Sequence, residues 1–114
     1  MLSVIIASTL STAFDLLQVR AQESPIEVWS DYTLDRDITF VGDGFIVKAD
    51  NVTLDLNGHT ITEGGEGIGV NLTEVNGVTV KNGEISNFSF GIYLRDAGNH
   101  TITGNTLTKN SYGI

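Results

Sequence analysis

Carboxylates are the residues of this chain that could do acid–base chemistry. Asp35 and Asp37 are two residues apart, so on an extended strand they point to the same side, and Asp55 follows about one repeat later. Hydrolysis of a glycosidic bond needs one carboxyl group as acid and another that activates water. No dense pair of carboxylates recurs at one position of successive repeats, so we expect these three aspartates to be solvated. We expect Arg95 and Asp96 to form a surface ion pair.

Histidines are the second group with candidate chemistry. Copper sites use His, Cys or Met, and this chain has His59, His100, no cysteine and one methionine, Met1. The histidines occupy different positions of the repeat. We expect His59 in a solvated turn and His100 at the margin of the core, unless the turn shifts by one residue. We therefore assign no catalytic, cofactor-binding or metal-binding residue.

Asparagines recur in a third pattern. Tripeptides that match the N-glycosylation acceptor begin at Asn51, Asn71, Asn87 and Asn99. Two interpretations remain open: these asparagines carry glycans, or the repeat uses Asn and Thr for turns and ladders, so that the tripeptide recurs by composition. Asn105 has a separate expected role, as an inward turn residue that bonds to the backbone of adjacent coils.

An internal repeat must position all of these residues. One phrase occurs at 56–61, 80–85 and 102–107, and a Gly-Ile pair follows each phrase, at 67–68, 91–92 and 113–114. Between these phrases, apolar residues alternate with polar ones, which indicates short strands with one buried face. Pairs such as Asn57-Gly58 and Asn82-Gly83 indicate turns. A word that returns every 22 to 24 residues predicts a coil of three strands and three turns, stacked as an all-β solenoid of about four rungs.

Like residues should stack in such a solenoid, because each strand pairs with its equivalents one rung above and below. We expect three inward ladders, which are Leu56, Val80 and Ile102; Ile61, Ile85 and Leu107; and Phe45, Ile68, Ile92 and Ile114.

The two ends of the chain differ from this body. Residues 1–21 begin with an apolar run and end in Val19-Arg20-Ala21, which predicts a signal peptide, with an N-terminal amphipathic helix as the alternative. We assign residues 22–33 to an N-terminal cap and residues 34–114 to parallel β-helix repeats. We expect these repeats to be incomplete, as the front portion of a longer solenoid. The alternative is end-to-end self-association through the open C-terminal rung.

Composition excludes several classes of partner. The formal net charge is −8 with only six Lys and Arg residues, which argues against a nucleic-acid partner because phosphate neutralisation needs clustered cations. No segment has about eighteen uninterrupted apolar residues, so we do not expect a membrane-spanning protein. Without cysteine, stability must come from stacking of the coils.

These words carry a family likeness. Residues 51–61, 91–94, 99–107 and 110–114 resemble right-handed parallel β-helix repeat proteins of the pectin lyase-like fold, and are most similar to the NosD-like periplasmic copper-binding group. The resemblance covers roughly residues 33–114 and implies the fold strongly. It implies function weakly, because pectate lyases, polygalacturonases and alginate epimerases share this repeat. Gly58-His59 lacks the following glycine of the hydrolase pattern.

Two functions from different classes follow. We expect a secreted, periplasmic or surface-displayed binding or scaffold module that acts on carbohydrate or a partner protein, needs no cofactor and has no chemistry of its own. The alternative is the N-terminal piece of a carbohydrate-active enzyme, a lyase, hydrolase or epimerase whose active site lies in further rungs.

Overall fold

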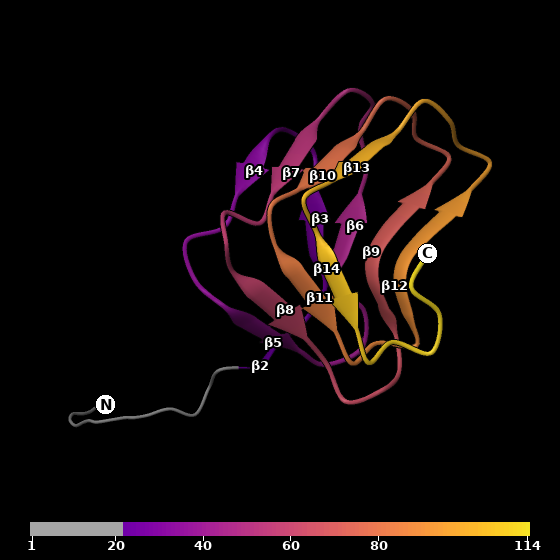
Figure 1. The fold of residues 1–114 in the computed structure, drawn as a ribbon. Helices are drawn as coiled ribbons and strands as arrows, with labels where there is room; N and C mark the ends of the chain where they lie inside the picture. Colours follow the sequence, from indigo (N-terminus) through magenta and orange to yellow (C-terminus); the bar gives the residue numbers. More distant parts are fainter. Residues whose placement is uncertain (1–21) are drawn as a thin grey trace, which may run out of the picture.

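The computed structural model describes residues 22–114, and these residues form a parallel β-solenoid without any helix (Figure 1). The expected signal peptide, residues 1–21, lies outside the described residues. Each coil passes through three short strands, and the next coil repeats them one rung further along the axis. The all-β solenoid of about four coils that the repeat predicts is confirmed. Within the described part of the chain, no helix is long and apolar enough to cross a membrane.

Three parallel sheets enclose one core, and we number them in the order in which a coil visits them. The first sheet has the order β13-β10-β7-β4 and comprises Thr101–Thr103, Thr79–Lys81, Thr53–Asp55 and Tyr32–Thr33. The second has the order β14-β11-β8-β5-β2 and comprises Thr106–Thr108, Glu84–Ser86, Thr60–Thr62, Ile38–Phe40 and Gln22–Glu23. The third has the order β12-β9-β6-β3 and comprises Phe90–Arg95, Ile68–Thr73, Phe45–Val47 and Ile26–Val28.

Residues 22–33, which we expect to cap the solenoid, supply the end strand of each sheet. β2 pairs with β5, β3 with β6 and β4 with β7, all in parallel. This segment therefore continues the register of the coils, and its capping role stays a prediction.

The core is a stack of aliphatic side chains closed by three phenylalanines. Leu54, Val80, Ile61 and Ile85 are fully buried, and each is flanked along its strand by less buried polar residues. This alternation places one side chain per short strand inside the solenoid. Burying a side chain of this size stabilises the fold by about 1.5–3 kcal/mol, so coil stacking replaces the missing disulfides.

One expected ladder is confirmed and two are shifted. Ile61, Ile85 and Leu107 lie in register in the second sheet, as expected. In the first sheet, the partner of Val80 is Leu54, not the expected Leu56. In the third sheet, the partner of Phe45 and Ile92 is Val70, not Ile68.

Longer turns in one coil cause both shifts. Leu54 and Val80 are 26 residues apart, whereas Val80 and Ile102 are 22 apart, because the coil that starts at β7 has longer turns after β7 and after β8. Leu56 is buried in the first of these turns, where it fills the space over Gly83; a Cβ at Gly83 would lie 2.2 Å from the Leu56 Cβ. A single stride cannot describe a coil whose turns differ in length.

The turns follow the chemistry that the Asn and Gly residues predict. Asn82 and Gly104 occupy equivalent turns and have positive φ angles of 65° and 67°. Asn105 has the expected role: its Oδ1 accepts a hydrogen bond from the Gly83 amide at 3.2 Å and its Nδ2 donates to the Val80 carbonyl at 2.8 Å. Turn asparagines thus satisfy backbone groups of the neighbouring coil that no strand partner reaches.

Candidate binding face

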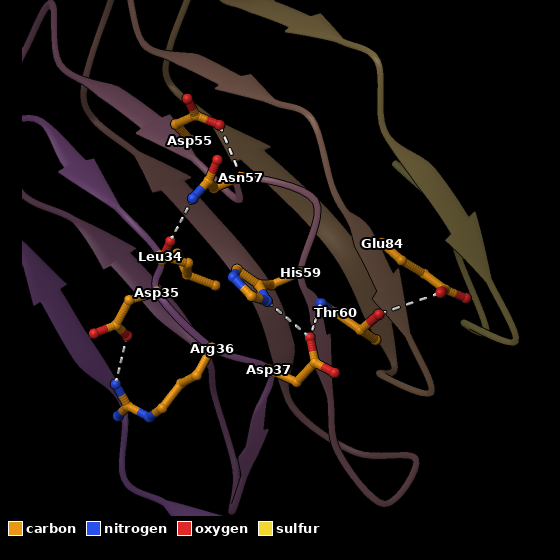
Figure 2. Close-up of polar contacts among 9 residues, drawn as sticks. All are labelled: Leu34, Asp35, Arg36, Asp37, Asp55, Asn57, His59, Thr60 and Glu84. Carbon is orange, nitrogen blue, oxygen red and sulfur yellow. Dashed lines mark hydrogen bonds and ion pairs between the residues drawn. The ribbon is translucent and has the colours of Figure 1, made fainter.

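Asp35 and Asp37 do not lie on a strand, contrary to our expectation. Both are exposed and lie in the turn between β4 and β5 (Figure 2). Asp35 accepts a hydrogen bond from Arg36 Nη1 at 3.0 Å, and Arg36 also pairs with Glu23. Asp35 is therefore part of a surface ion pair rather than of an acid–base pair.

Asp37 contacts the next coil. Its Oδ1 accepts a hydrogen bond from the Thr60 amide at 2.9 Å and lies 3.2 Å from His59 Nδ1 (Figure 2). The hydrogen bond from the Thr60 amide, and more weakly His59, lower the pKa of Asp37 although partial desolvation opposes them. The His59 side chain is 30% exposed and follows the turn after β7. The group links two coils, and its two side chains can exchange a proton with solvent.

The remaining carboxylates of this region act as acceptors within the fold. Asp55 accepts a hydrogen bond from the Asn57 amide at 2.8 Å. Glu84 accepts from the Thr60 hydroxyl at 3.3 Å and from the Thr108 hydroxyl at 3.1 Å, so it connects three successive rungs of the second sheet (Figure 2). Each carboxylate has a local structural partner, and they do not gather into a catalytic pair.

Arg95 and Asp96 form the expected surface ion pair, with 3.6 Å between Nε and Oδ2 and side chains 67% and 68% exposed. Among the acceptor-pattern asparagines, Asn51, Asn87 and Asn99 are exposed and have positive φ, whereas Asn71 lies within β9. Turn formation thus explains three of these four positions, and their glycosylation stays a prediction.

The outer faces of the first two sheets carry hydroxyl groups. In register on the first sheet lie Thr53, Thr79 and Thr101. The outward residues of the second sheet are likewise polar, and Ser86 donates a hydrogen bond to Thr62 at 3.3 Å. We call these two surfaces the threonine faces. They resemble each other and contain no outward aromatic residue.

The outer face of the third sheet is different, because outward apolar side chains gather there. These side chains, which we call the aromatic face, are Trp29, Ile46, Ile68, Phe90, Tyr93 and Tyr112. Phe90 stacks on Tyr112 with ring centroids 5.0 Å apart and an interplanar angle of 16°, and it meets Tyr93 edge to face at 5.4 Å. Trp29 and Tyr112 are 64% and 62% exposed.

A glycine column makes the outward position of Phe90 possible. Gly69 and Gly91 follow Ile68 and Phe90, and a Cβ built on Gly69 would lie 2.8 Å from the core atom Ile85 Cγ2. Gly69 therefore faces inward, next to the inward Val70, and the residue before the glycine turns outward. Such a local break of alternation is typical of a β-bulge with Gly.

Our sequence analysis did not identify the aromatic face, although the sequence holds two signals for it. Ser111-Tyr112-Gly113-Ile114 repeats Ser89-Phe90-Gly91-Ile92 at a stride of 22 residues, which predicts that Phe90 and Tyr112 stack. The flanking apolar residues Ile92 and Leu94 also predict an outward Tyr93.

The fold and this face define a parallel β-helix with one surface available for binding. A family model described as "Periplasmic copper-binding protein (NosD)" matches residues 24–114, and the chain belongs to this family. Neither the curated proteins nor the solved structures contain a match.

The described residues do not fit a copper ion, despite the description of the family. His59 follows the turn after β7, whereas His100 lies in the turn before β13, at a different corner of the coil. His100 Nδ1 accepts a hydrogen bond from the Val78 amide at 3.1 Å, which removes it as a ligand, and its Nε2 is buried without a partner. Among residues 22–114, no three His, Cys, Asp or Glu side chains gather as a metal site. The single methionine, Met1, lies outside this range.

Proposed function

We propose that the chain is a periplasmic or secreted β-helix module that binds carbohydrate on its aromatic face and performs no chemistry itself. The observation that carries this proposal is the gathering of outward Phe90, Tyr93 and Tyr112 on one sheet, beside two sheets whose outward residues are polar. The family's periplasmic description supports the location.

The chemistry of aromatic rings suits a sugar. The face of an aromatic ring is electronegative, so it attracts the C–H hydrogens that cover one side of a pyranose. Hydroxyls of the same sugar need hydrogen-bonding groups nearby, and Asn71 lies in register with Tyr93 on the next strand. A rigid parallel sheet fixes both kinds of group before the ligand arrives, which reduces the entropic cost of binding.

Binding to polysaccharide tests this proposal directly. We would measure retention of the chain in gels that contain soluble polysaccharides, comparing the native sequence with the double variant Phe90→Ala/Tyr93→Ala. The matched control is Thr62→Ala/Thr108→Ala, which changes two outward residues of a threonine face. We expect the control to bind like the native chain and the aromatic variant to lose binding. Absence of binding by the native chain to any polysaccharide contradicts the proposal.

A second candidate function is that of a fragment of a carbohydrate-active enzyme. The contact of Asp37 with His59 favours it, because a carboxylate can orient an imidazole for proton transfer. Release of reducing ends or of unsaturated products from a polysaccharide by this chain, abolished in Asp37→Asn, would support it over the binding module.

Self-association is a further part of the proposal. Within residues 22–114, the strands β12, β13 and β14 stand at one end of their sheets and could pair with strands of a second copy. Sedimentation velocity over a range of concentrations tests this, and a mass that stays monomeric throughout rules it out.

A further inference from the structure

The aromatic face is elongated, since its residues come from every rung of the third sheet. Glu27, Ile46, Asn71 and Tyr93 lie in register from β3 to β12. Successive rungs are about 4.8 Å apart, so this column extends about 14 Å along the solenoid axis. Thr73 and Arg95 form the start of a parallel column two residues further along the strands. A ligand that uses the whole face must be an extended chain.

Trp29 stands at the opposite end of this face from Tyr93. It directly follows β3, and its Nε1 donates a hydrogen bond to Glu27 at 3.3 Å, which places the indole beside the outward column. Its exposure of 64% leaves most of the indole open to a ligand. Aromatic surface is thus present at both ends of the column.

Charges at the edges of the third sheet select against an anionic ligand. On the strand face, Glu27 is accompanied by Lys48, which follows β6, and by Arg95, which is already paired with Asp96. The turns before and after the strands carry six carboxylates and one lysine; these are Asp43, Asp50, Glu63, Glu66, Glu74, Asp96 and Lys109. A polyanion along this face would meet like charges on both edges, which costs free energy at low salt.

We infer that the ligand is an uncharged, extended polysaccharide that lies along the solenoid axis on the aromatic face. This inference rests on the proposed carbohydrate binding and adds the charge and the orientation of the ligand. The face supplies aromatic surface for the apolar sides of the sugars, and Asn71 and Thr73 supply hydrogen-bonding groups between the two aromatic ends.

The charge of the ligand is tested by gel retention with hydroxyethyl cellulose and galactomannan as neutral probes, polygalacturonate as the anionic probe and chitosan as the cationic probe. We expect a neutral probe to bind at least tenfold more tightly than polygalacturonate, with little change between 20 and 200 mM salt. Tighter binding of polygalacturonate or chitosan, lost in Phe90→Ala/Tyr93→Ala, overturns this inference and leaves the proposed function intact. Absence of binding to every probe overturns both.

The orientation is tested with Trp29→Ala and Tyr93→Ala against a series of neutral oligosaccharides. If the ligand lies along the axis, Trp29→Ala weakens binding of the longer oligosaccharides about threefold to tenfold and leaves a disaccharide unaffected. If Trp29→Ala has no effect at any length while Tyr93→Ala does, the ligand lies across the strands and the inferred orientation is wrong. Thermal unfolding of each variant confirms that it is folded before comparison.

Discussion

The second and third sheets have the same parallel backbone and opposite exteriors. Inward residues of both are buried and interchangeable in kind, as Ile85 and Ile92 show. Outward, the second sheet presents Glu84 held by threonine hydroxyls, whereas the third presents Phe90 and Tyr93 in contact with each other. The inward positions therefore determine the fold, and the outward positions are free to determine what each face binds.

A pair of phenylalanines two residues apart provides the largest test of this comparison. Phe88 is 1% exposed and belongs to the core, whereas Phe90 belongs to the aromatic face. We expect Phe88→Ala to lower the free energy of unfolding by about 3–5 kcal/mol, because it leaves a cavity. Phe90→Ala should cost about 1–2 kcal/mol, because it loses two exposed ring contacts. Urea unfolding measures both, and equal losses would contradict the distinction.

The inward glycine of the third sheet should be the next most sensitive position. A Cβ at Gly69 would lie 2.5 Å from the Gly91 carbonyl oxygen, so Gly69→Ala must displace a neighbouring rung. We expect a loss of about 1–3 kcal/mol. Gly64 is the matched control, since nothing lies within 4 Å of a Cβ there. Gly64→Ala should unfold at the same urea concentration as the native chain.

Asparagine bridges between coils can be separated atom by atom. Asn105→Ala leaves the Gly83 amide and the Val80 carbonyl without their partner, and we expect a loss of about 1–3 kcal/mol. Asn105→Asp keeps the acceptor and loses the donor, so its loss should be intermediate. If Asn105→Ala unfolds like the native chain, the bridges do not stabilise the stack.

Much of this fold could be predicted from the sequence, because coil stacking is written in the alternation and in the repeat. The ladder of Ile61 and Ile85 was placed correctly because their strands are separated by one uniform stride in both chosen landmarks. Leu56 and Ile68 were placed wrongly because turn length varies between coils, and only the paired backbones show which turn holds extra residues.

The candidate face was harder to predict for a different reason. Exposed aromatics such as Tyr93 read as ordinary strand residues until the register shows that Phe90 and Tyr112 share one surface. The aspartates attracted attention by type alone, yet Asp37 is fixed by a backbone amide of the next coil that no spacing argument specifies.

The contact between Asp37 and the next coil should give the smallest effect, visible through pH. The Thr60 amide lowers the pKa of Asp37 in the folded state, so this carboxylate contributes stability above its unfolded pKa of about 3.9. That contribution disappears as pH falls through the lowered folded pKa. The difference in unfolding midpoint between the native chain and Asp37→Asn should therefore be present at pH 7 and shrink towards pH 3. A difference that stays constant over this range would contradict the assignment.

Nuclear magnetic resonance with a neutral oligosaccharide tests the central claim most directly, because it reports each face of the same molecule at once. The account predicts that titration shifts the signals of Phe90, Tyr93 and the Asn71 side-chain amide while those of Thr62, Ser86 and Thr108 stay unchanged. Shifts confined to the threonine faces, with the aromatic signals unmoved, would contradict it.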